Sequence, residues 1–141
     1  MKTNILTIIL ISLLATFASP QPAQAISPAP DGCYPNFTTA EGCDALNLLT
    51  TGEGNTGLGW RALYSMGAGN FNTGIGAGAL ALNIGDSNTA VGTAALLLNI
   101  PGTDNTAVGA SVLLVNFSGA ANTAVGSEAL PPTEQGAATL T

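Results

Sequence analysis

Polar, small and aliphatic positions follow one fixed pattern from Thr38 onward, and its clearest copy is residues 88–104, NTAVGTAALLLNIPGTD. The glycine that ends the NTAVG phrase recurs at steps of 17, 17, 16, 17 and 17 residues, and a leucine stands four residues after each of these glycines. A period of this length is too short for paired-helix repeats and is typical of parallel β-solenoids. The pattern therefore predicts an all-β, parallel β-solenoid of about six coils of 16–17 residues over residues 38–138.

Each repeat is expected to hold two short strands. We number the asparagine of the NTAVG phrase as position 1, so that Asn88 and Val91 stand at positions 1 and 4. Positions 2–5 and 8–11 predict the strands, because glycine, Asn, Asp and Ser mark the turns between them. Side chains alternate along a strand, so placing Val91 in the core also places Thr89 there and turns positions 1, 3 and 5 outward. The large core residues are then those at positions 4, 9 and 11.

The predicted outward face at positions 3 and 5 carries almost no side chains. Because three large apolar residues are few for holding one coil together, we expect this bare face to pack between chains. The alternative is that small residues simply fit a thin solenoid. The expected oligomer interface comprises Gly57, Gly59, Gly74, Gly76, Ala90, Gly92, Ala107, Gly109, Ala124 and Gly126.

Two polar columns recur in every clear repeat. The asparagines at position 1, from Asn55 to Asn122, are expected to stack their side-chain amides from coil to coil. The threonines at position 2, from Thr39 to Thr123, form a ladder that would suit ice binding if it faced water from a flat sheet. The alternation described above turns this ladder inward, which argues against ice binding.

Positions 10 and 13 become apolar in the middle repeats although they are expected to face outward. Stacked coils lie about 4.8 Å apart, so these residues would form a continuous stripe. Exposed apolar patches of this kind mark binding or assembly sites, and the alternative is that the stripe completes an interchain core. The stripe comprises Ile84, Leu97, Ile100, Leu114 and Phe117.

The first 25 residues have the organisation of a secretory signal peptide. Lys2 is followed by an apolar segment from Ile5 to Ala18 and by an Ala-Gln-Ala cleavage triplet that ends at Ala25. The apolar segment is shorter than the roughly 20 residues that span a bilayer, and no membrane span is expected after cleavage. We divide the chain into a signal peptide (1–25), an N-terminal segment or cap (26–37), the repeat domain (38–138) and a short tail (139–141).

Charge and residue types exclude several functions. Cleavage would remove the only lysine and leave Arg61 as the sole basic residue against eight acidic ones, so nucleic acids and anionic membrane surfaces are poor partners. The chain contains no histidine and lacks the usual nucleophile–base pairs of hydrolases. We expect no enzymatic activity, no cofactor and no metal. Glu53, Asp86 and Asp104 stand at similar turn positions, and a calcium ladder is the alternative there, although the repeat lacks the spacing of known calcium-binding β-helices.

Cys33 and Cys43 are the only cysteines. In an exported chain an even pair predicts a disulfide, here closing a small loop over the first coil. A metal pair is the alternative, but the chain offers no further zinc ligands of the Cys or His type.

The phrase N-T-A-V-G-x-x-A-L followed by a glycine turn resembles the head repeats of trimeric autotransporter adhesins and the repeats of bacterial and phage fibre proteins. The resemblance covers residues 38–138 and implies a left-handed parallel β-roll that packs three to a trimer. We therefore expect a secreted, non-enzymatic adhesive or structural module that binds its own copies and a host or matrix surface. A self-assembling subunit of an extracellular filament or matrix is the alternative.

Overall fold

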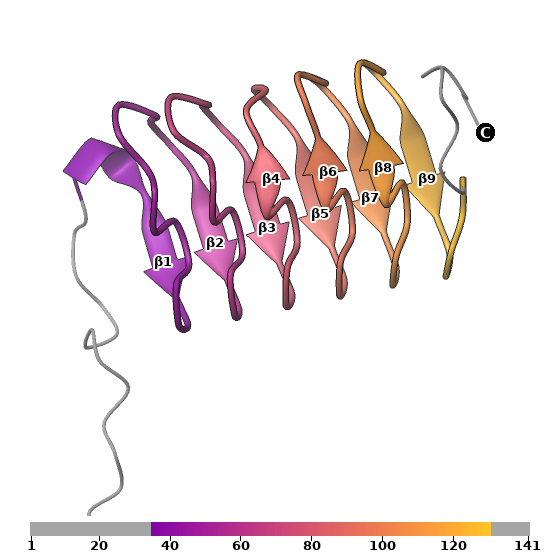
Figure 1. The fold of residues 1–141 in the computed structure, drawn as a ribbon, viewed down its shortest axis with the longest axis horizontal. Coiled ribbons are helices and arrows are strands. Elements are labelled where there is room, and N and C mark those ends of the chain that lie inside the picture. Colours follow the sequence, from indigo (N-terminus) through magenta and orange to yellow (C-terminus); the bar gives the residue numbers. More distant parts are fainter. Residues whose placement is uncertain (1–34, 131–141) are drawn as a thin grey trace, which may run out of the picture.

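The structure, a computed structural model, describes residues 35–130 and has the all-β, parallel solenoid architecture that the repeat predicts (Figure 1). A short 3-10 helix, η1 (Pro35–Phe37), precedes β1. The chain then winds around one axis, and five turns separate β1 from β9. Its strands are β1 (Thr39–Glu41), β2 (Thr56–Leu58), β3 (Thr73–Ile75), β4 (Leu82–Asn83), β5 (Thr89–Val91), β6 (Leu98–Asn99), β7 (Thr106–Val108), β8 (Val115–Asn116) and β9 (Thr123–Val125).

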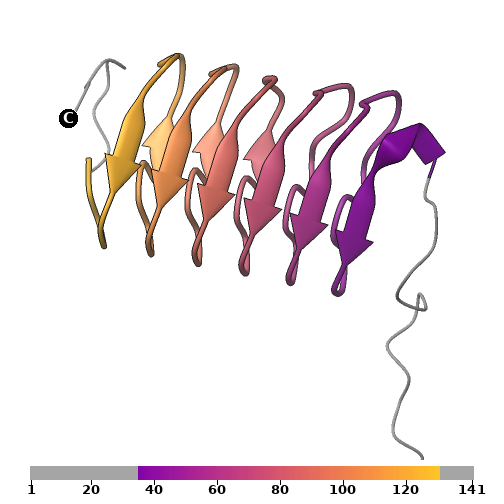
Figure 2. The same ribbon diagram turned by 180° about the vertical axis from the view of Figure 1, so that it is seen from behind.

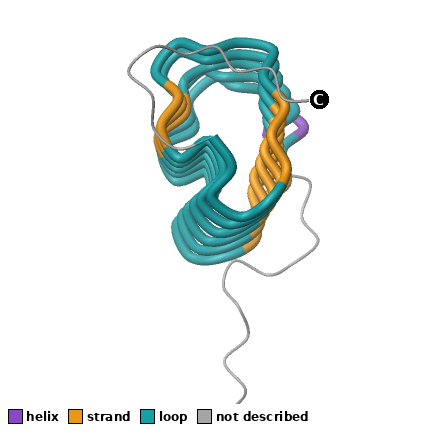
Figure 3. Tube along the Cα trace, turned by 90° about the vertical axis from the view of Figure 1, so that its right-hand side faces the viewer, coloured by secondary structure: helices purple, strands orange, loops and turns teal. Residues whose placement is uncertain are grey.

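The strands form two parallel sheets on opposite sides of each coil (Figure 3). One sheet has six strands in the order β1-β2-β3-β5-β7-β9, and the other has three in the order β4-β6-β8. Pairing is in exact register, so that each repeat position stacks on the same position of the next coil: Thr89 pairs with Thr106, and Leu98 with Val115. Figure 2 shows the six strands side by side.

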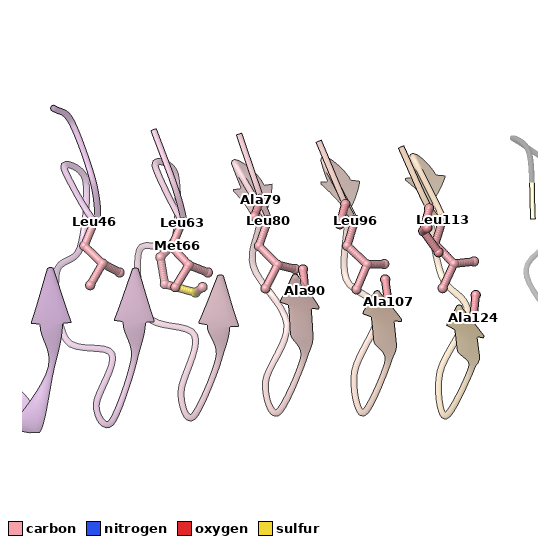
Figure 4. Close-up of a cluster of buried hydrophobic side chains, with 12 residues drawn as sticks. Leu46, Leu63, Met66, Ala79, Leu80, Ala90, Leu96, Ala107, Leu113 and Ala124 are labelled. Atoms are coloured by element: carbon pink, nitrogen blue, oxygen red, sulfur yellow. The ribbon is translucent and has the colours of Figure 1, made fainter. Parts of the chain in front are cut away.

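The core is a thin column of leucine and alanine (Figure 4). The position 9 leucines stack along the axis, and alanines of positions 3 and 8 fill the space beside them. Met66 occupies position 12 of the second coil, where the next three coils have asparagine, and it is fully buried. The buried residues of this column are Leu46, Leu63, Met66, Ala79, Leu80, Ala90, Ala95, Leu96, Ala107, Val112, Leu113 and Ala124.

The alternation along the first strand of each repeat is opposite to the sequence prediction. Ala107 at position 3 is fully buried, whereas its neighbour Val108 at position 4 is 37% exposed. Position 3 faces the interior, where the leucine of position 9 leaves room only for a small side chain. A Cβ added to Gly74 would lie 3.1 Å from both Leu63 Cγ and Ala79 O, so only glycine or alanine fits there. Threonine and valine consequently point outward.

The second predicted strand is also shorter than expected. Positions 8–11 do not form one strand, because every leucine at position 9 has a positive φ, between 46° for Leu113 and 55° for Leu130. This left-handed conformation turns the chain and aims the leucine inward. A strand of two residues follows at positions 11 and 12 in three coils only. Position 11 therefore faces outward rather than into the core.

The asparagine stacking predicted at position 1 is confirmed, but it lies inside the solenoid. Asn72 donates from its backbone N and its Nδ2 to Asn55 Oδ1, at 2.9 and 3.2 Å, and the same pair of bonds links Asn105 to Asn88. A second buried ladder at position 12, which the sequence analysis missed, consists of Asn83, Asn99 and Asn116.

The two asparagine ladders are cross-linked, since Asn88 Nδ2 donates to Asn83 Oδ1 at 3.3 Å. Their amides also donate to the buried glycine carbonyls of the second glycine column, for example from Asn99 Nδ2 to Gly102 O at 2.7 Å. Among the described residues, no buried side-chain nitrogen or oxygen is left without a hydrogen-bond partner. The polar half of the interior thus compensates its own desolvation.

Candidate interaction surfaces

The outer face of the six-stranded sheet is a regular surface that runs from β1 to β9. We call it the threonine–aliphatic face. Positions 2 and 4 point outward on every strand, and the face carries one charged residue, Glu41, at its first strand. The side chains that form it are Thr39, Thr56, Thr73, Thr89, Thr106 and Thr123 with Leu58, Ile75, Val91, Val108 and Val125.

The threonine–aliphatic face is a two-dimensional array. Threonines repeat along the axis at the strand spacing of about 4.8 Å, and each lies about 6.7 Å from the aliphatic side chain two residues along its own strand. Ile75, Val108 and Val125 are exposed, while Leu58 and Val91 are half-buried. The array is therefore open to solvent in the single chain.

The oligomer interface predicted from the sequence is wrong at position 3. Gly57, Gly74, Ala90, Ala107 and Ala124 are buried within the solenoid and cannot contact another chain. The glycines of position 5 are accessible to solvent in part, but their lack of side chains has another cause. Gly59, Gly76, Gly92, Gly109 and Gly126 have φ between 125° and 134°, and a Cβ on Gly76 would lie 2.6 Å from Gly92 O. These glycines allow neighbouring coils, not neighbouring chains, to touch.

The apolar stripe lies at the surface beside the three-stranded sheet. Ile84 and Phe117, at position 13, are 54% and 53% exposed, and Ile100 is also exposed. Leu97 and Leu114, at position 10, are half-buried. Position 11 adds side chains that the sequence analysis placed in the core: Leu82 is exposed, and Leu98 and Val115 are half-buried. We call the outward residues of positions 11 and 13 the outer apolar stripe; they are Leu82, Ile84, Leu98, Ile100, Val115 and Phe117.

A hollow of about 260 Å³ opens at the start of the three-stranded sheet. Its lining comes from the second, third and fourth coils: Trp60, Arg61, Tyr64, Gly78, Ala81, Leu82 and Leu97. The Arg61 guanidinium lies over both aromatic rings, with its Cζ 4.9 Å from the Trp60 ring and 5.0 Å from the Tyr64 ring. This site was not predicted from the sequence, although Trp60, Arg61 and Tyr64 differ in type from the residues at the same positions of the third coil, Ala77, Gly78 and Ala81.

The acidic turn residues Asp86 and Glu53 form hydrogen bonds to the turn of a neighbouring coil. Asp86 Oδ1 accepts hydrogen bonds from the backbone N of Asn70 at 2.7 Å and from its Nδ2 at 3.2 Å. Glu53 donates from its backbone N to Asn70 Oδ1 at 3.0 Å. Within residues 35–130 no three His, Cys, Asp or Glu side chains lie close enough to hold a metal ion together.

Several predictions fall on the termini. The signal peptide, Cys33 and residues 131–141 lie outside the described residues. Cys43 is exposed, and its thiol is free in the structure. In residues 35–130 we find no helix with the length and apolar character of a membrane span. Comparison of the chain with family models, with curated proteins and with solved structures gave no match.

Proposed function

We propose that this protein is an exported, non-enzymatic adhesive or structural module that associates with its own copies. The threonine–aliphatic face is the observation that carries this proposal. It is a continuous sheet surface over six stacked strands, it bears aliphatic side chains on five of them, and Glu41 is its one charge. Soluble monomers rarely leave such a large apolar array in water.

A second copy of this chain is the occupant that we infer for the threonine–aliphatic face. Charged residues are depleted at the centre of protein interfaces, and β-branched side chains such as Val91 and Val108 pack there with little loss of conformational freedom. The repeat resembles those of trimeric adhesin heads, which makes a trimer the expected assembly. Burial of this face would also add the large apolar contacts that each thin coil lacks.

If the threonine–aliphatic face is covered by a second copy, the outer apolar stripe remains free to bind a target. It lies on the other sheet, so the two functions use opposite sides of the coil (Figure 3). Ile84, Ile100 and Phe117 are exposed there without an apolar cover within the described chain. We infer that this stripe attaches the assembled module to a matrix or cell surface.

End-to-end stacking into a filament is the structural variant of this proposal. Strands β1 and β9 each have one neighbour in the six-stranded sheet of the described residues, and open strand edges pair readily with further strands. The trimer and the filament can be told apart by the mass of the assembly. The mass of a filament increases with protein concentration, whereas that of a closed trimer does not.

Ice binding is a second candidate, favoured by one observation. The six threonines point outward from a regular, in-register parallel sheet. The alternation assumed from the sequence predicted the opposite, inward orientation. A repeating array of hydroxyl and methyl groups is the kind of surface that can order water in a lattice. Ice and a second copy would compete for the same face.

A single substitution separates these candidates. Val108→Glu places a charge at the middle of the threonine–aliphatic face on a side chain that is already partly exposed, so the fold should persist while the assembly falls to monomers. Ser118→Glu, in an exposed turn, is the matched control. Sedimentation velocity measures the assembly, and circular dichroism measures the fold.

A wild-type protein that sediments as a monomer and inhibits ice recrystallisation would favour the ice-binding candidate, provided that Val108→Glu abolishes the inhibition. Assembly that is unchanged in Val108→Glu would mean that the threonine–aliphatic face is not the interface. Attachment to surfaces is tested separately with Phe117→Ser, which should lower it without changing the assembly.

A further inference from the structure

The hollow between the second and fourth coils is a departure from the repeat and not a consequence of it. Position 7 holds Asp44, Arg61, Ala94, Ser111 and Glu128 in other coils, each with a positive φ. The backbone of this turn therefore accepts a side chain. Gly78 stands at the same position in the third coil, and a Cβ there would meet Leu97 Cδ1 at 3.4 Å, an ordinary contact.

Two neighbouring features, together with the absence of a side chain at Gly78, form the hollow. Ala81, in the third coil, stacks beside Tyr64 of the second coil and Leu97 of the fourth at position 10. Small residues thus form the floor, and larger side chains rise on both sides. Trp60, which is 55% exposed, adds an aromatic surface at the rim.

Arg61 is the one charged residue that lines the hollow, and a carboxylate outside the hollow balances its charge. Arg61 Nε donates to Asp44 Oδ2 at 3.4 Å, and both side chains are nearly half exposed. The terminal guanidinium nitrogens of Arg61 hold no hydrogen bond within the described residues. Arg61 therefore offers free donors to a ligand, and Asp44, which does not line the hollow, balances its charge.

This combination selects one ligand chemistry. An apolar floor and aromatic rings match a ligand face made of C–H groups, and the free donors of Arg61 match hydroxyl groups, whose oxygens accept hydrogen bonds. A carboxylated or sulfated ligand would gain the donors of Arg61 but would meet Asp44 and a chain with a formal charge of -6. The chemistry of a neutral pyranose satisfies all of these conditions.

We propose that the hollow lined by Trp60, Arg61, Tyr64, Gly78, Ala81 and Leu97 binds a neutral pyranose unit of an extracellular polysaccharide. The C–H face of the sugar lies on the Gly78–Ala81 floor against Tyr64, and its hydroxyl oxygens accept hydrogen bonds from Arg61. A volume of about 260 Å³ lies below the range of drug-sized pockets and admits a small ligand. This inference rests on the proposed adhesive function, for which it names the target class.

Trp60 provides a direct probe, because it is the only tryptophan in the chain. The full chain is titrated with cellohexaose, chitohexaose and mannohexaose while tryptophan fluorescence is recorded. We expect a saturable change with at least one of these neutral oligosaccharides. No change with any of them, or a change only with an acidic oligosaccharide such as oligoalginate, would overturn the inference.

Two variants locate the site. Ala81→Leu fills the hollow and retains Trp60, and Tyr64→Leu removes an aromatic wall; each should weaken binding by about tenfold or more. Leu114→Ala, at the same repeat position as Tyr64 but outside the hollow, is the matched control and should bind as the wild type does. Circular dichroism identifies a variant that fails to fold, and Ala81→Leu is decisive if Tyr64→Leu does fail.

The two proposals fail in different ways. If Phe117→Ser lowers attachment while the hollow variants keep full oligosaccharide binding, the hollow is not the site and the adhesive function stands. If the wild type neither assembles nor attaches to any surface, the proposed function itself is wrong, whatever the fluorescence shows.

Discussion

Asn99 Nδ2 donates a hydrogen bond of 2.7 Å to Asn83 Oδ1 in the preceding coil, and neither side chain is exposed to solvent. Asn99 Oδ1 in turn accepts from Asn116 Nδ2 at 2.7 Å. The chain thus places a continuous row of amides where most proteins place aliphatic side chains. Such a row is favourable only if every member has a partner.

We expect Asn99→Ala to destabilise the fold by about 1–3 kcal/mol, because the substitution leaves a gap and removes one of the two acceptors of the Asn116 amide. Asn47→Ala, at an exposed asparagine, should stay within about 0.5 kcal/mol of the wild type. Urea unfolding followed by circular dichroism measures both. Equal stabilities for the two variants would contradict a structural role for the buried amides.

Adjacent residues on opposite sides of one strand provide the second prediction. Ala107→Glu buries a carboxylate in a space that admits only a methyl group, and it should cost at least about 3 kcal/mol of stability. Val108→Glu points into solvent and should leave the unfolding midpoint of the single chain nearly unchanged. If Ala107→Glu remains folded and only dissociates the assembly, position 3 faces outward after all.

The glycines of position 5 give a third prediction. Gly92 has φ +134°, and an added Cβ would overlap the carbonyl of Gly109. We expect Gly92→Ala to lose about 3 kcal/mol or more. Gly67 also has a positive φ of 60°, but nothing lies within 4 Å of its added Cβ, so Gly67→Ala should lose only about 1 kcal/mol. Thermal unfolding of the pair separates a close coil contact from simple backbone preference.

The fourth prediction concerns the exported protein. Export to an oxidising compartment should pair the exposed thiol of Cys43 with Cys33, because secreted chains form disulfides between available cysteines. Mass spectrometry of secreted protein without reductant should give a chain that begins at Ile26 and is two hydrogens lighter than the reduced form. Two alkylatable thiols in that material would disprove the disulfide.

The sequence alone determined the period, and with it the parallel solenoid. It also determined the stacking of the position 1 asparagines and the role of the position 9 leucines. The solenoid and the stacking follow from the repeat, because an in-register stack places each residue on its equivalent in the next coil, whatever the direction of its side chain. The core role of the leucines follows from a large apolar residue at position 9 in every repeat. Thr89 must lie on Thr106 in any such solenoid.

Only the tertiary structure decided which set of alternating side chains faces inward. Hydrophobicity favours Val91 over Asn88 as the core residue, but Leu96 adopts φ +49° and fills the interior, which leaves room for small residues and for amides. The amides are satisfied there because identical coils supply their partners, and a single repeat cannot show this. The hollow likewise depends on Trp60, Gly78 and Leu97 standing in three successive coils. These residues are close together only in the folded solenoid, where the second, third and fourth coils stack on one another.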